Sequence, residues 1–525
     1  MATEKITQIL EKHPDLKSDL FIRGFLITTK KIENLDKFPF YNNWSQKQCG
    51  KLYLLKHSLA NIYTHTNNKN LTFFICGHAY DPFTMKYDEN EILKDIAAAH
   101  KNNKYLEKIN DLTGNFVLGI IDDKKIEFLV DPSGMQSACW GKINNDFYIS
   151  SHPQLIADIC NLKMDDFAYE LTKYKWYGRV MGPYLPADLT SFSEVKRIVP
   201  SIFYKYDNEL THKRYWPLVP QNVAEGKEYD KIIQQAGDIL KNNMKLVSQK
   251  WKNPWISLTG GIDSNTTFAA ANNNYDKFNT FSYLSAEKEI PDVKAAKTIA
   301  GAFNVKHHEY NIPESNKDIS LFEERRELFR HNSAYAHELY DNEARKKFFL
   351  RDNAKCDVEV KSWTSETIRC YWYKHYGRKK MPKLSPKLYR NLYKIFISNR
   401  KLAHQVDKLF EEYLEKYEYY KIPDSYPPAD MHYNDVTWGS WGGMNISEMR
   451  YCFEITIPYN NRRFLDLMFR APIDKRISDE HHLDLKKYLN KELWDMNIRI
   501  VNAKETAFRA WALNVIFTFN SFLPL

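Results

Sequence analysis

The segment Thr259-Gly260-Gly261-Ile262-Asp263-Ser264 combines residue types that suit the binding of a polyphosphate. The two glycines allow backbone amides to approach a phosphate closely, and a helix that starts after them directs the positive end of its dipole to the same place. Thr259 and Ser264 add hydroxyl donors, and the carboxylate of Asp263 can hold Mg²⁺, which neutralises charge on a leaving pyrophosphate. The segment therefore predicts a nucleotide site. The structural alternative is a Gly-Gly turn followed by an Asp/Ser helix cap.

This loop must be positioned by the elements that flank it. An apolar run at 255–258 predicts a strand before the glycines, and we expect a helix from about Asn265. A second strand-like run spans 278–284, and a helical pattern spans roughly 292–303. Strands that alternate with helices predict a parallel sheet, and a long, charged, helical region is expected over about 321–421.

The first part of the chain has a different pattern, in which short apolar runs alternate with turn signals. It predicts strands at 20–22, 71–75, 116–121, 126–130 and 147–149, with a hairpin over 122–125. After Trp216-Pro217 a polar linker leads to a helical pattern over 229–249. We therefore expect an antiparallel, sheet-rich domain over 1–217 and a second domain over 218–525.

Composition restricts the class of protein. Of 525 residues, 43% are hydrophobic and 14% aromatic, which predicts globular domains. The formal charge of +9 is modest for this length, and the densest basic stretch, at 378–387, is interpreted as a solvated loop rather than a nucleic-acid groove. No apolar run is long enough to span a membrane, and the seven dispersed cysteines contain no Cys-x-x-Cys pair. We expect a cytoplasmic protein that binds neither membranes nor nucleic acids.

The nucleotide segment resembles the Ser-Gly-Gly-Leu-Asp-Ser motif of the asparagine synthetase and β-lactam synthetase superfamily, with Thr259 where serine is usual. The similarity continues through Phe281-Ser282, Asp292 and Lys306-His307-His308-Glu309. We interpret the two histidines as ordinary strand-end residues. The resemblance implies binding of ATP and Mg²⁺ in an ATP pyrophosphatase domain, with these nucleotide-binding residues: Ser257, Leu258, Thr259, Gly260, Gly261, Asp263, Ser264 and Ser282.

A second family signature, usually Ser-Gly-Glu-Gly-Ser-Asp-Glu, is similar to the segment Lys361 to Thr367. Glu366 stands at the position of the metal-binding aspartate, so the resemblance implies that Asp263 and Glu366 are the metal ligands. Trp363 falls where asparagine synthetases have glutamate and β-lactam synthetases have tyrosine, which argues against simple asparagine synthesis. Trp363 is either a core aromatic or part of the substrate wall.

The C-terminal part is similar to the family from Glu454 to Asp466, with a short insertion before Phe464. Lys504 then stands where the family places a lysine that stabilises the acylation transition state, and we name it as the catalytic candidate. Its alternative is an ordinary surface lysine.

The N-terminal part resembles the glutamine amidotransferase domain of the family at 112–116, 131–134 and 186–200. Glutamine hydrolysis there requires a cysteine at position 2, whereas this chain has Ala2 and about 20 residues before its first strand. The resemblance implies an Ntn-hydrolase-like αββα sandwich without glutaminase activity. The C-terminal domain is expected to be a doubly wound parallel sheet of the ATP pyrophosphatase, adenine nucleotide α-hydrolase-like kind, with a large helical part.

The predicted function is an ATP- and Mg²⁺-dependent synthetase that adenylates a carboxylate, releases pyrophosphate and joins the acyl group to an amine or ammonia. β-Lactam synthetases and lasso-peptide cyclases of the same superfamily use an amine on a substrate, so a specialised biosynthetic pathway is preferred. A small molecule or peptide supplies the carboxylate, and a homodimer is left open. An RNA-modifying enzyme with the same loop is a less favoured alternative, and a catalytically degenerate nucleotide-binding relative is the main one.

Overall fold

Two antiparallel sheets form the N-terminal part of the chain in the computed structural model, which describes residues 2–394, 396, 398–500 and 507–522. The first sheet has the order β10 (Val195–Arg197), β8 (Cys139–Ile143), β9 (Asp146–Ser150), β1 (Phe25–Thr28), β3 (Leu52–His57), β2 (Trp44–Cys49). The second has the order β12 (Glu209–Arg214), β11 (Ile202–Asp207), β7 (Lys125–Val130), β6 (Thr113–Asp122), β5 (Thr72–Tyr80), β4 (Ile62–Thr66). The predicted antiparallel, sheet-rich region is confirmed.

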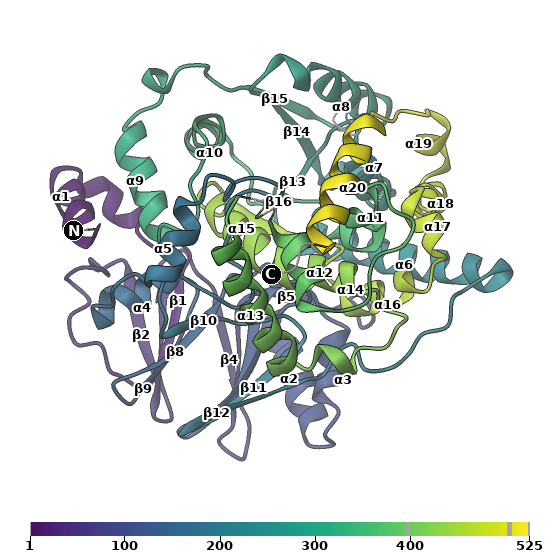
Figure 1. Ribbon diagram of the computed structural model, residues 1–525. Coiled ribbons are helices and arrows are strands. Elements are labelled where there is room, and N and C mark those ends of the chain that lie inside the picture. Colours follow the sequence, from purple (N-terminus) through teal and green to yellow (C-terminus); the bar gives the residue numbers. More distant parts are fainter. Residues whose placement is uncertain (1, 395, 397, 501–506, 523–525) are drawn as a thin grey trace.

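Helices cover the outer faces of both sheets (Figure 1). The facing sides of the sheets share one apolar core, in which Ile27 of β1 and Val117 of β6 are buried. Ile6 of α1 (Ala2–Lys12) and Leu155 of α4 (Pro153–Cys160) pack in the cluster on the outside of the first sheet. Ile92 of α2 (Glu89–His100), with α3 (Tyr105–Asn110), covers the second. The layers therefore follow the order helix, sheet, sheet, helix.

The strand expected at Leu20–Ile22 is absent, and that prediction is wrong. The segment after η1 (Pro14–Asp19) is a turn, because Phe21 and Arg23 have φ values of 51° and 55° and the amide of Gly24 donates to the carbonyl of Phe21 at 2.9 Å. An apolar run alone does not distinguish a buried turn from a buried strand. The hairpin over 122–125 is confirmed, since Asp122 pairs with Lys125 across the β6–β7 turn.

A parallel five-stranded sheet forms the centre of the C-terminal part, as predicted. Its order is β15 (His307–Asn311), β14 (Asn279–Leu284), β13 (Pro254–Ser257), β16 (Val358–Val360), β17 (Glu454–Thr456), and each neighbouring pair is parallel. Along the chain, β14 and β15 are added on one side of β13, and β16 and β17 are then added on its other side. The direction of winding thus reverses between β13 and β16.

Helices alternate with the strands in this part of the chain. α6 (Gly226–Lys250) precedes β13, and α7 (Ile262–Ala270) and α8 (Ile290–Ala302) follow β13 and β14. Phe268 of α7 and Phe303, just after α8, have ring centroids 5.7 Å apart, so both helices cover the same face. The region expected to be helical contains α9 (Phe322–Asn332), α10 (Asp341–Asn353), α11 (Tyr371–His375), α12 (Pro386–Tyr393) and α13 (Arg400–Lys416), interrupted by β16.

The remaining C-terminal elements complete the fold. They are α14 (Pro428–His432), the π-helix η7 (Tyr433–Gly442), α15 (Gly443–Met449), α16 (Arg462–Phe469), α17 (Ile473–Ile477), α18 (Glu480–Leu489), α19 (Lys491–Asp495) and α20 (Ala507–Phe522). The cysteines are all free, and Cys49, Cys76, Cys139 and Cys370 are buried. Among the described residues, no helix is both long enough and apolar enough to cross a membrane.

Buried polar contacts join β5 and β6 of the second sheet to β17 of the parallel sheet. The Nε2 atom of His78 lies 3.0 Å from Oγ1 of Thr456, and the amide side chain of Asn115 donates to the carbonyl of Ile455 at 2.9 Å. Burial lowers the pKa of His78 to about 3 from an ordinary 6.5. His78 therefore stays neutral when folded but takes up a proton below about pH 6.5 when the chain unfolds.

We expect this buried histidine to make the fold acid-sensitive. Each pH unit below 6.5 should cost the folded state about 1.4 kcal/mol at this residue, because only the unfolded chain binds the extra proton. His78→Gln should remove that cost. Urea unfolding at about pH 7 and about pH 5 should show a loss of stability that is about 2 kcal/mol smaller in the variant. His65→Gln on β4 is the control, and equal losses in wild type and His78→Gln would contradict the prediction.

Candidate nucleotide and metal site

Two loops meet where the winding of the parallel sheet reverses. The loop after β13 carries the two glycines and leads into α7, and the loop after β16 leads into the short 3₁₀ helix η5 (Ser365–Arg369). Because β13 and β16 are adjacent and parallel, both loops leave the same edge of the sheet. In open α/β sheets, ligands bind in the crevice outside the carboxyl ends of the strands at such a point.

The amides of the glycine loop already donate to side-chain oxygens. Gly260 N donates to Oδ1 of Asp292 at 2.9 Å, Gly261 N to Oγ1 of Thr259 at 3.1 Å, and Thr259 N to Oγ of Ser264 at 3.2 Å. The hydroxyls of Thr259 and Ser264 are themselves 2.9 Å apart. The loop therefore presents several amides to oxygen acceptors, and phosphate oxygens could replace the hydroxyls as acceptors.

Gly260 is required by close packing against the segment before α20. A Cβ atom at this position would lie 2.4 Å from Cδ1 and 2.9 Å from Cβ of Ile500. The backbone holds the same contact, since Ile500 N donates to the Gly260 carbonyl at 2.9 Å. No side chain fits there unless Ile500 moves.

We therefore expect Gly260→Ala to displace Ile500 and to disturb the loop. ATP affinity should fall at least about tenfold, because the loop amides must lie within a few tenths of an ångström of their acceptors. Gly301→Ala in α8 is the matched control, since a Cβ there meets nothing within 4 Å. Calorimetric titration with ATP would test this, and equal affinities for both variants would show that the packing is unimportant.

The two predicted metal ligands lie on the loops after β13 and β16, at the junction of loops that we call the crevice. Asp263 is in the first turn of α7, where Oδ1 accepts the hydroxyl of Ser365 at 2.7 Å. Oε2 of Glu366 is buried and has no hydrogen-bond partner among the described residues. Burial, followed by the negative charge of Asp263, raises the pKa of Glu366 to about 8. A cation between the carboxylates would satisfy the orphaned oxygen and relieve the repulsion.

The donor set fits magnesium, which commonly uses one or two carboxylates and completes its shell with phosphate oxygens and water. The described residues contain no cluster of three or more His, Cys, Asp or Glu side chains arranged to hold a metal. Asp263 and Glu366 would thus hold Mg²⁺ together with a nucleotide rather than in a closed protein cage.

Three cations surround these carboxylates, and the sequence did not single them out. Nη1 of Arg369 donates to Oδ2 of Asp263. Nε and Nη2 of the same side chain donate to the carboxylate oxygens of Asp479 at 2.8 and 2.9 Å. Lys374 also pairs with Asp479, and Arg499 Nη2 lies 3.2 Å from it. Burial alone would raise the pKa of Asp479, but Arg369 and Lys374 outweigh it and lower that pKa. A basic cluster beside the glycine loop suits a polyphosphate.

The other candidate nucleotide residues play smaller parts in the described structure. The Ser257 hydroxyl donates to the carbonyl of Val360 at 3.3 Å, and Leu258 is fully buried, so only its backbone can face a ligand. The Ser282 hydroxyl lies 2.9 Å from Nε2 of His307, and the ring of His308 stacks on Trp255 at 4.1 Å. Both histidines thus make ordinary packing contacts. Lys504 lies outside the described residues.

Trp363 belongs to a cluster of three indoles at the edge of this crevice. Its ring centroid is 5.3 Å from that of Trp438 and 5.4 Å from that of Trp441, and Lys361 Nζ lies 5.1 Å from its centre. Trp438 and Trp441 come from η7, a π-helical segment of the kind that is frequent at functional sites. Trp363 and Trp441 are only half-buried, so they could line a substrate as well as pack together.

A separate cavity lies between the first N-terminal sheet and helices α9 and α15. The cavity has a volume of about 70 Å³. Its lining includes Ile22, His152, Phe329, Met444 and Glu448. Its carboxylate is already neutralised, because Glu448 accepts from Lys347 at 2.6 Å and from His337 at 2.5 Å. The chemistry is therefore better placed in the crevice, where a buried carboxylate oxygen lacks a partner.

Residues 255–360 match the family model for asparagine synthase, and the chain therefore contains an asparagine synthase domain. The matched range runs from β13 to β16, so it includes the glycine loop and ends just before the loop that carries Glu366.

Two solved structures are similar to part of the chain. One is glutamine phosphoribosylpyrophosphate amidotransferase from B. subtilis complexed with ADP and GMP, at 10% identity and a TM-score of 0.23. The other is described as the allosteric regulatory enzyme of purine biosynthesis, at 10% identity and a TM-score of 0.24. Each similarity covers 56% of this chain, which spans 61% and 60% of those chains. No curated protein matches the sequence. The function is therefore inferred from the crevice and from the asparagine synthase domain.

Proposed function

We propose that the protein is an ATP- and Mg²⁺-dependent carbon–nitrogen ligase, which adenylates a carboxylate with release of pyrophosphate and passes the acyl group to an amine or ammonia. The observation that carries this proposal is the meeting of Asp263 and Glu366 beside the glycine loop, at the point where the sheet reverses its winding. The asparagine synthase domain supports the same reaction class.

Each group in the crevice has a task in this reaction. The amides of the glycine loop would bind phosphate oxygens in place of the hydroxyls of Thr259 and Ser264. Asp263 and Glu366 would hold Mg²⁺, which when bound supplies charge neutralisation to the pyrophosphate. Arg369, held by Asp479, would supply positive charge to the departing phosphates, together with the other cations around Asp479. The resemblance assigns Lys504 to stabilisation of the acyl transfer.

The nitrogen source is proposed to be free ammonia or an amine on a substrate. A glutaminase of this kind needs its nucleophile at the free N-terminus, next to the first strand. Here Arg23 and Gly24 come directly before β1 and carry no nucleophilic side chain. Arg23 donates from Nε to the Arg450 carbonyl at 2.9 Å and lies 3.7 Å from Glu454. We therefore regard the N-terminal domain as an Ntn-hydrolase-like scaffold without glutaminase activity.

The division of the chain into domains at 217/218 belongs to the same proposal. The antiparallel sheets end with β12 at Arg214, and α6 starts at Gly226. The order of the parallel sheet, with β13 at its centre, supports a doubly wound ATP pyrophosphatase domain over 218–525.

A non-catalytic nucleotide-binding protein is the second candidate, and the position of Arg369 favours it. The guanidinium of Arg369 occupies the carboxylate that a metal would use, and Trp363 replaces the acid or phenol of related synthetases. A protein of this kind would bind ATP without turning it over.

The deciding experiment is Mg²⁺-dependent pyrophosphate release from ATP against a panel of amino acids, sugar acids and peptides, with ammonia or a primary amine supplied. A ligase should need one class of carboxylate, and Asp263→Ala should abolish release. Asp276→Ala is the matched control, because that carboxylate is exposed and lies outside the crevice. ATP binding without release across the panel would overturn the ligase in favour of the second candidate.

A further inference from the structure

The last described helix, α20, exposes a continuous apolar stripe. Phe508, Trp511, Val515 and Phe519 are 75%, 62%, 49% and 59% exposed, and their spacing places them on one face of the helix. The opposite face packs on the protein, where Phe517 is buried against Tyr376 with ring centroids 4.6 Å apart. A helix that is apolar on both faces is normally covered on both. The exposed stripe therefore indicates a surface that something else covers.

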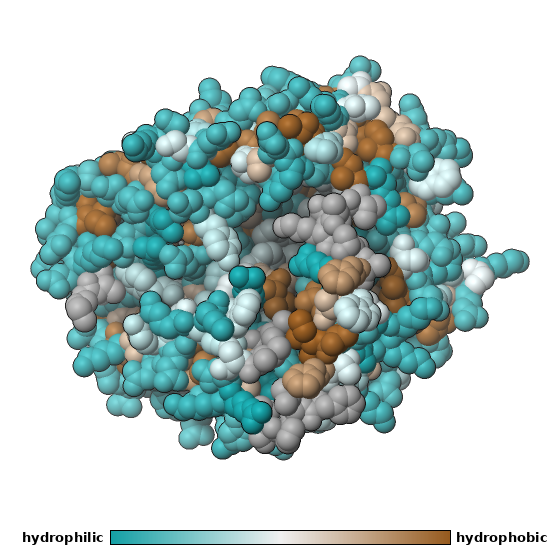
Figure 2. Space-filling model, turned by 45° about the horizontal axis from the view of Figure 1, so that its top comes forward, coloured by the Kyte–Doolittle hydropathy of each residue, from teal (hydrophilic) through white to brown (hydrophobic). Residues whose placement is uncertain are grey.

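A basic loop lies directly beside this stripe. Arg378 donates to Asn514 and Thr518 of α20 at 2.8 and 3.1 Å, which fixes the loop against the helix. The next lysines, Lys379, Lys380 and Lys383, are exposed and take part in none of the ion pairs of the described residues. Figure 1 shows α20 on the near side of the molecule, and Figure 2 shows brown side chains gathered in a patch on that face. Apolar rings and unpaired positive charges thus share one surface.

We propose that the α20 stripe and the loop 378–383 form a site that binds the surface of an anionic lipid bilayer. Tryptophan and phenylalanine insert well at the boundary between head groups and acyl chains, and nearby lysines are attracted by anionic head groups. A second copy of the chain fits this surface less well, because a symmetric contact through α20 would bring two basic loops together. This proposal departs from the expectation, drawn from the sequence, that the protein makes no membrane contact. It is independent of the proposed ligase activity.

The test is co-sedimentation of the full chain with vesicles of phosphatidylcholine alone and of phosphatidylcholine mixed with phosphatidylglycerol. Binding should require phosphatidylglycerol and should weaken as salt is added, because exposed charges are screened. The triple variant Phe508→Ser, Trp511→Ser, Phe519→Ser should lose at least about tenfold in partitioning, and so should Lys379→Glu, Lys380→Glu, Lys383→Glu.

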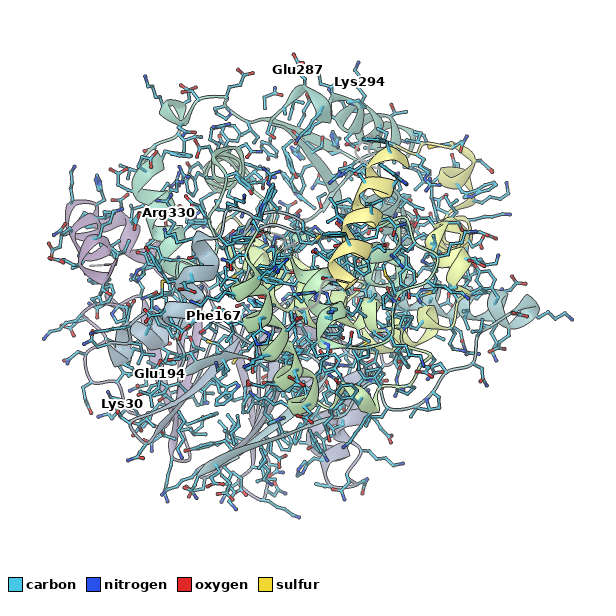
Figure 3. The ribbon with its side chains drawn as sticks, in the orientation of Figure 1. Lys30, Phe167, Glu194, Glu287, Lys294 and Arg330 are labelled. Atoms are coloured by element: carbon cyan, nitrogen blue, oxygen red, sulfur yellow. The ribbon has the colours of Figure 1, made fainter. Side chains whose placement is uncertain are left out.

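Matched controls distinguish binding through this site from nonspecific binding through other exposed apolar groups or through net charge. Leu218→Ser, Val219→Ser, Val223→Ser removes equally exposed apolar groups in the linker before α6. Lys30→Glu, Lys101→Glu, Lys124→Glu makes the same change of charge on the N-terminal domain, where Figure 3 shows Lys30 at the lower left, away from α20. Both controls should bind like wild type, and circular dichroism should show all variants folded.

Three results would overturn the proposal. They are no binding to either vesicle, equal binding by the α20 variants and their controls, and binding that ignores phosphatidylglycerol. A concentration-dependent dimer, seen by analytical ultracentrifugation and lost only in the α20 variants, would reassign the stripe to self-association. Capture of an acidic protein without any vesicle binding would reassign it to a protein partner.

Discussion

Glu366→Gln is expected to lower kcat/KM for pyrophosphate release at least about 100-fold, or about 2.7 kcal/mol. Oε2 of Glu366 is a buried carboxylate oxygen that has no hydrogen-bond partner among the described residues and is held near Asp263, and the proposed Mg²⁺ would be its partner. Glutamine has nearly the same shape but removes the charge, so it should weaken the metal site without creating a cavity. The concentration of Mg²⁺ needed for half-maximal ATP binding should rise at least about tenfold, which calorimetry can measure without turnover.

Two further variants test whether the effect of Glu366→Gln comes from the loss of a metal ligand. Glu366→Asp keeps the carboxylate with a shorter reach and should retain more of the metal affinity than the glutamine variant. Glu287→Gln removes a carboxylate at the rim of the molecule, as Figure 3 shows, and should behave like wild type. Glu366→Gln with an unchanged Mg²⁺ requirement would exclude Glu366 as a ligand and would favour the non-catalytic candidate.

The strand, glycine turn and helix that carry the candidate nucleotide site could be predicted from sequence because the pattern is local. Two glycines, a following helix and the Asp263 and Ser264 side chains lie within a few residues, and their geometry is set by the strand and helix on either side. The parallel sheet could be predicted for a similar reason, since the strand at β14 and the helix α8 have clear periodic patterns.

Two segments show where sequence patterns fail, one wrongly predicted as a strand and one strand that was not predicted. Leu20–Ile22 is apolar enough for a strand, yet it forms a turn because backbone conformation at Phe21 and Arg23 is decided by packing around them. β16 is only three residues long and has Glu359 at its centre, so nothing in its composition indicates a central strand. Its place beside β13 is fixed by parallel pairing, which joins residues about a hundred positions apart.

The basic cluster around Asp479 could not be predicted because its members are far apart in the chain. Arg369 and Lys374 are near Glu366 in sequence, but Asp479 and Arg499 come from the region around α18 and α19. Only the fold brings them to Asp263. One signal was present, since Arg369 follows Glu366 by one helical turn and a cation at that spacing lies on the same face.

With the proposed metal, Arg369 would give the crevice two states with different charge pairing. It joins Asp263 to Asp479, so both carboxylates are neutralised when no metal is present. A metal at Asp263 and Glu366 would replace the hydrogen bond between Nη1 of Arg369 and Asp263. The two hydrogen bonds to Asp479 would keep the guanidinium in place. The same residue would thus protect the empty site from repulsion and supply positive charge to bound phosphates.

Asp430→Ala is expected to produce the largest loss of stability, about 3–5 kcal/mol in the free energy of unfolding. Arg476 and Asp430 are 2% and 1% exposed, and Nη2 of Arg476 donates to Oδ2 of Asp430 at 2.6 Å. Burial raises the pKa of Asp430, while Arg476 acts in the opposite direction. Removing the carboxylate leaves a guanidinium that is always charged in the protein interior, where Arg476 forms no ion pair with any other carboxylate of the described residues.

This ion pair also supports η5, the short helix that carries Glu366. The Asp430 variants should therefore have a second effect, on the proposed metal site. Arg476 donates from Nε to the carbonyl of Ile368 at 2.8 Å, so it holds η5 and the Glu366 side chain that η5 carries. Urea unfolding should show the full loss of unfolding free energy for Asp430→Ala and a smaller loss for Asp430→Asn, because asparagine keeps a hydrogen-bond acceptor. The exposed Asp424→Ala is the control and should change the unfolding free energy by no more than about 0.5 kcal/mol. At a temperature where Asp430→Asn remains folded, its Mg²⁺ requirement should still rise, because η5 is held less firmly. Stability equal to wild type in Asp430→Ala would mean that water or another group satisfies Arg476, and η5 would then need a different anchor.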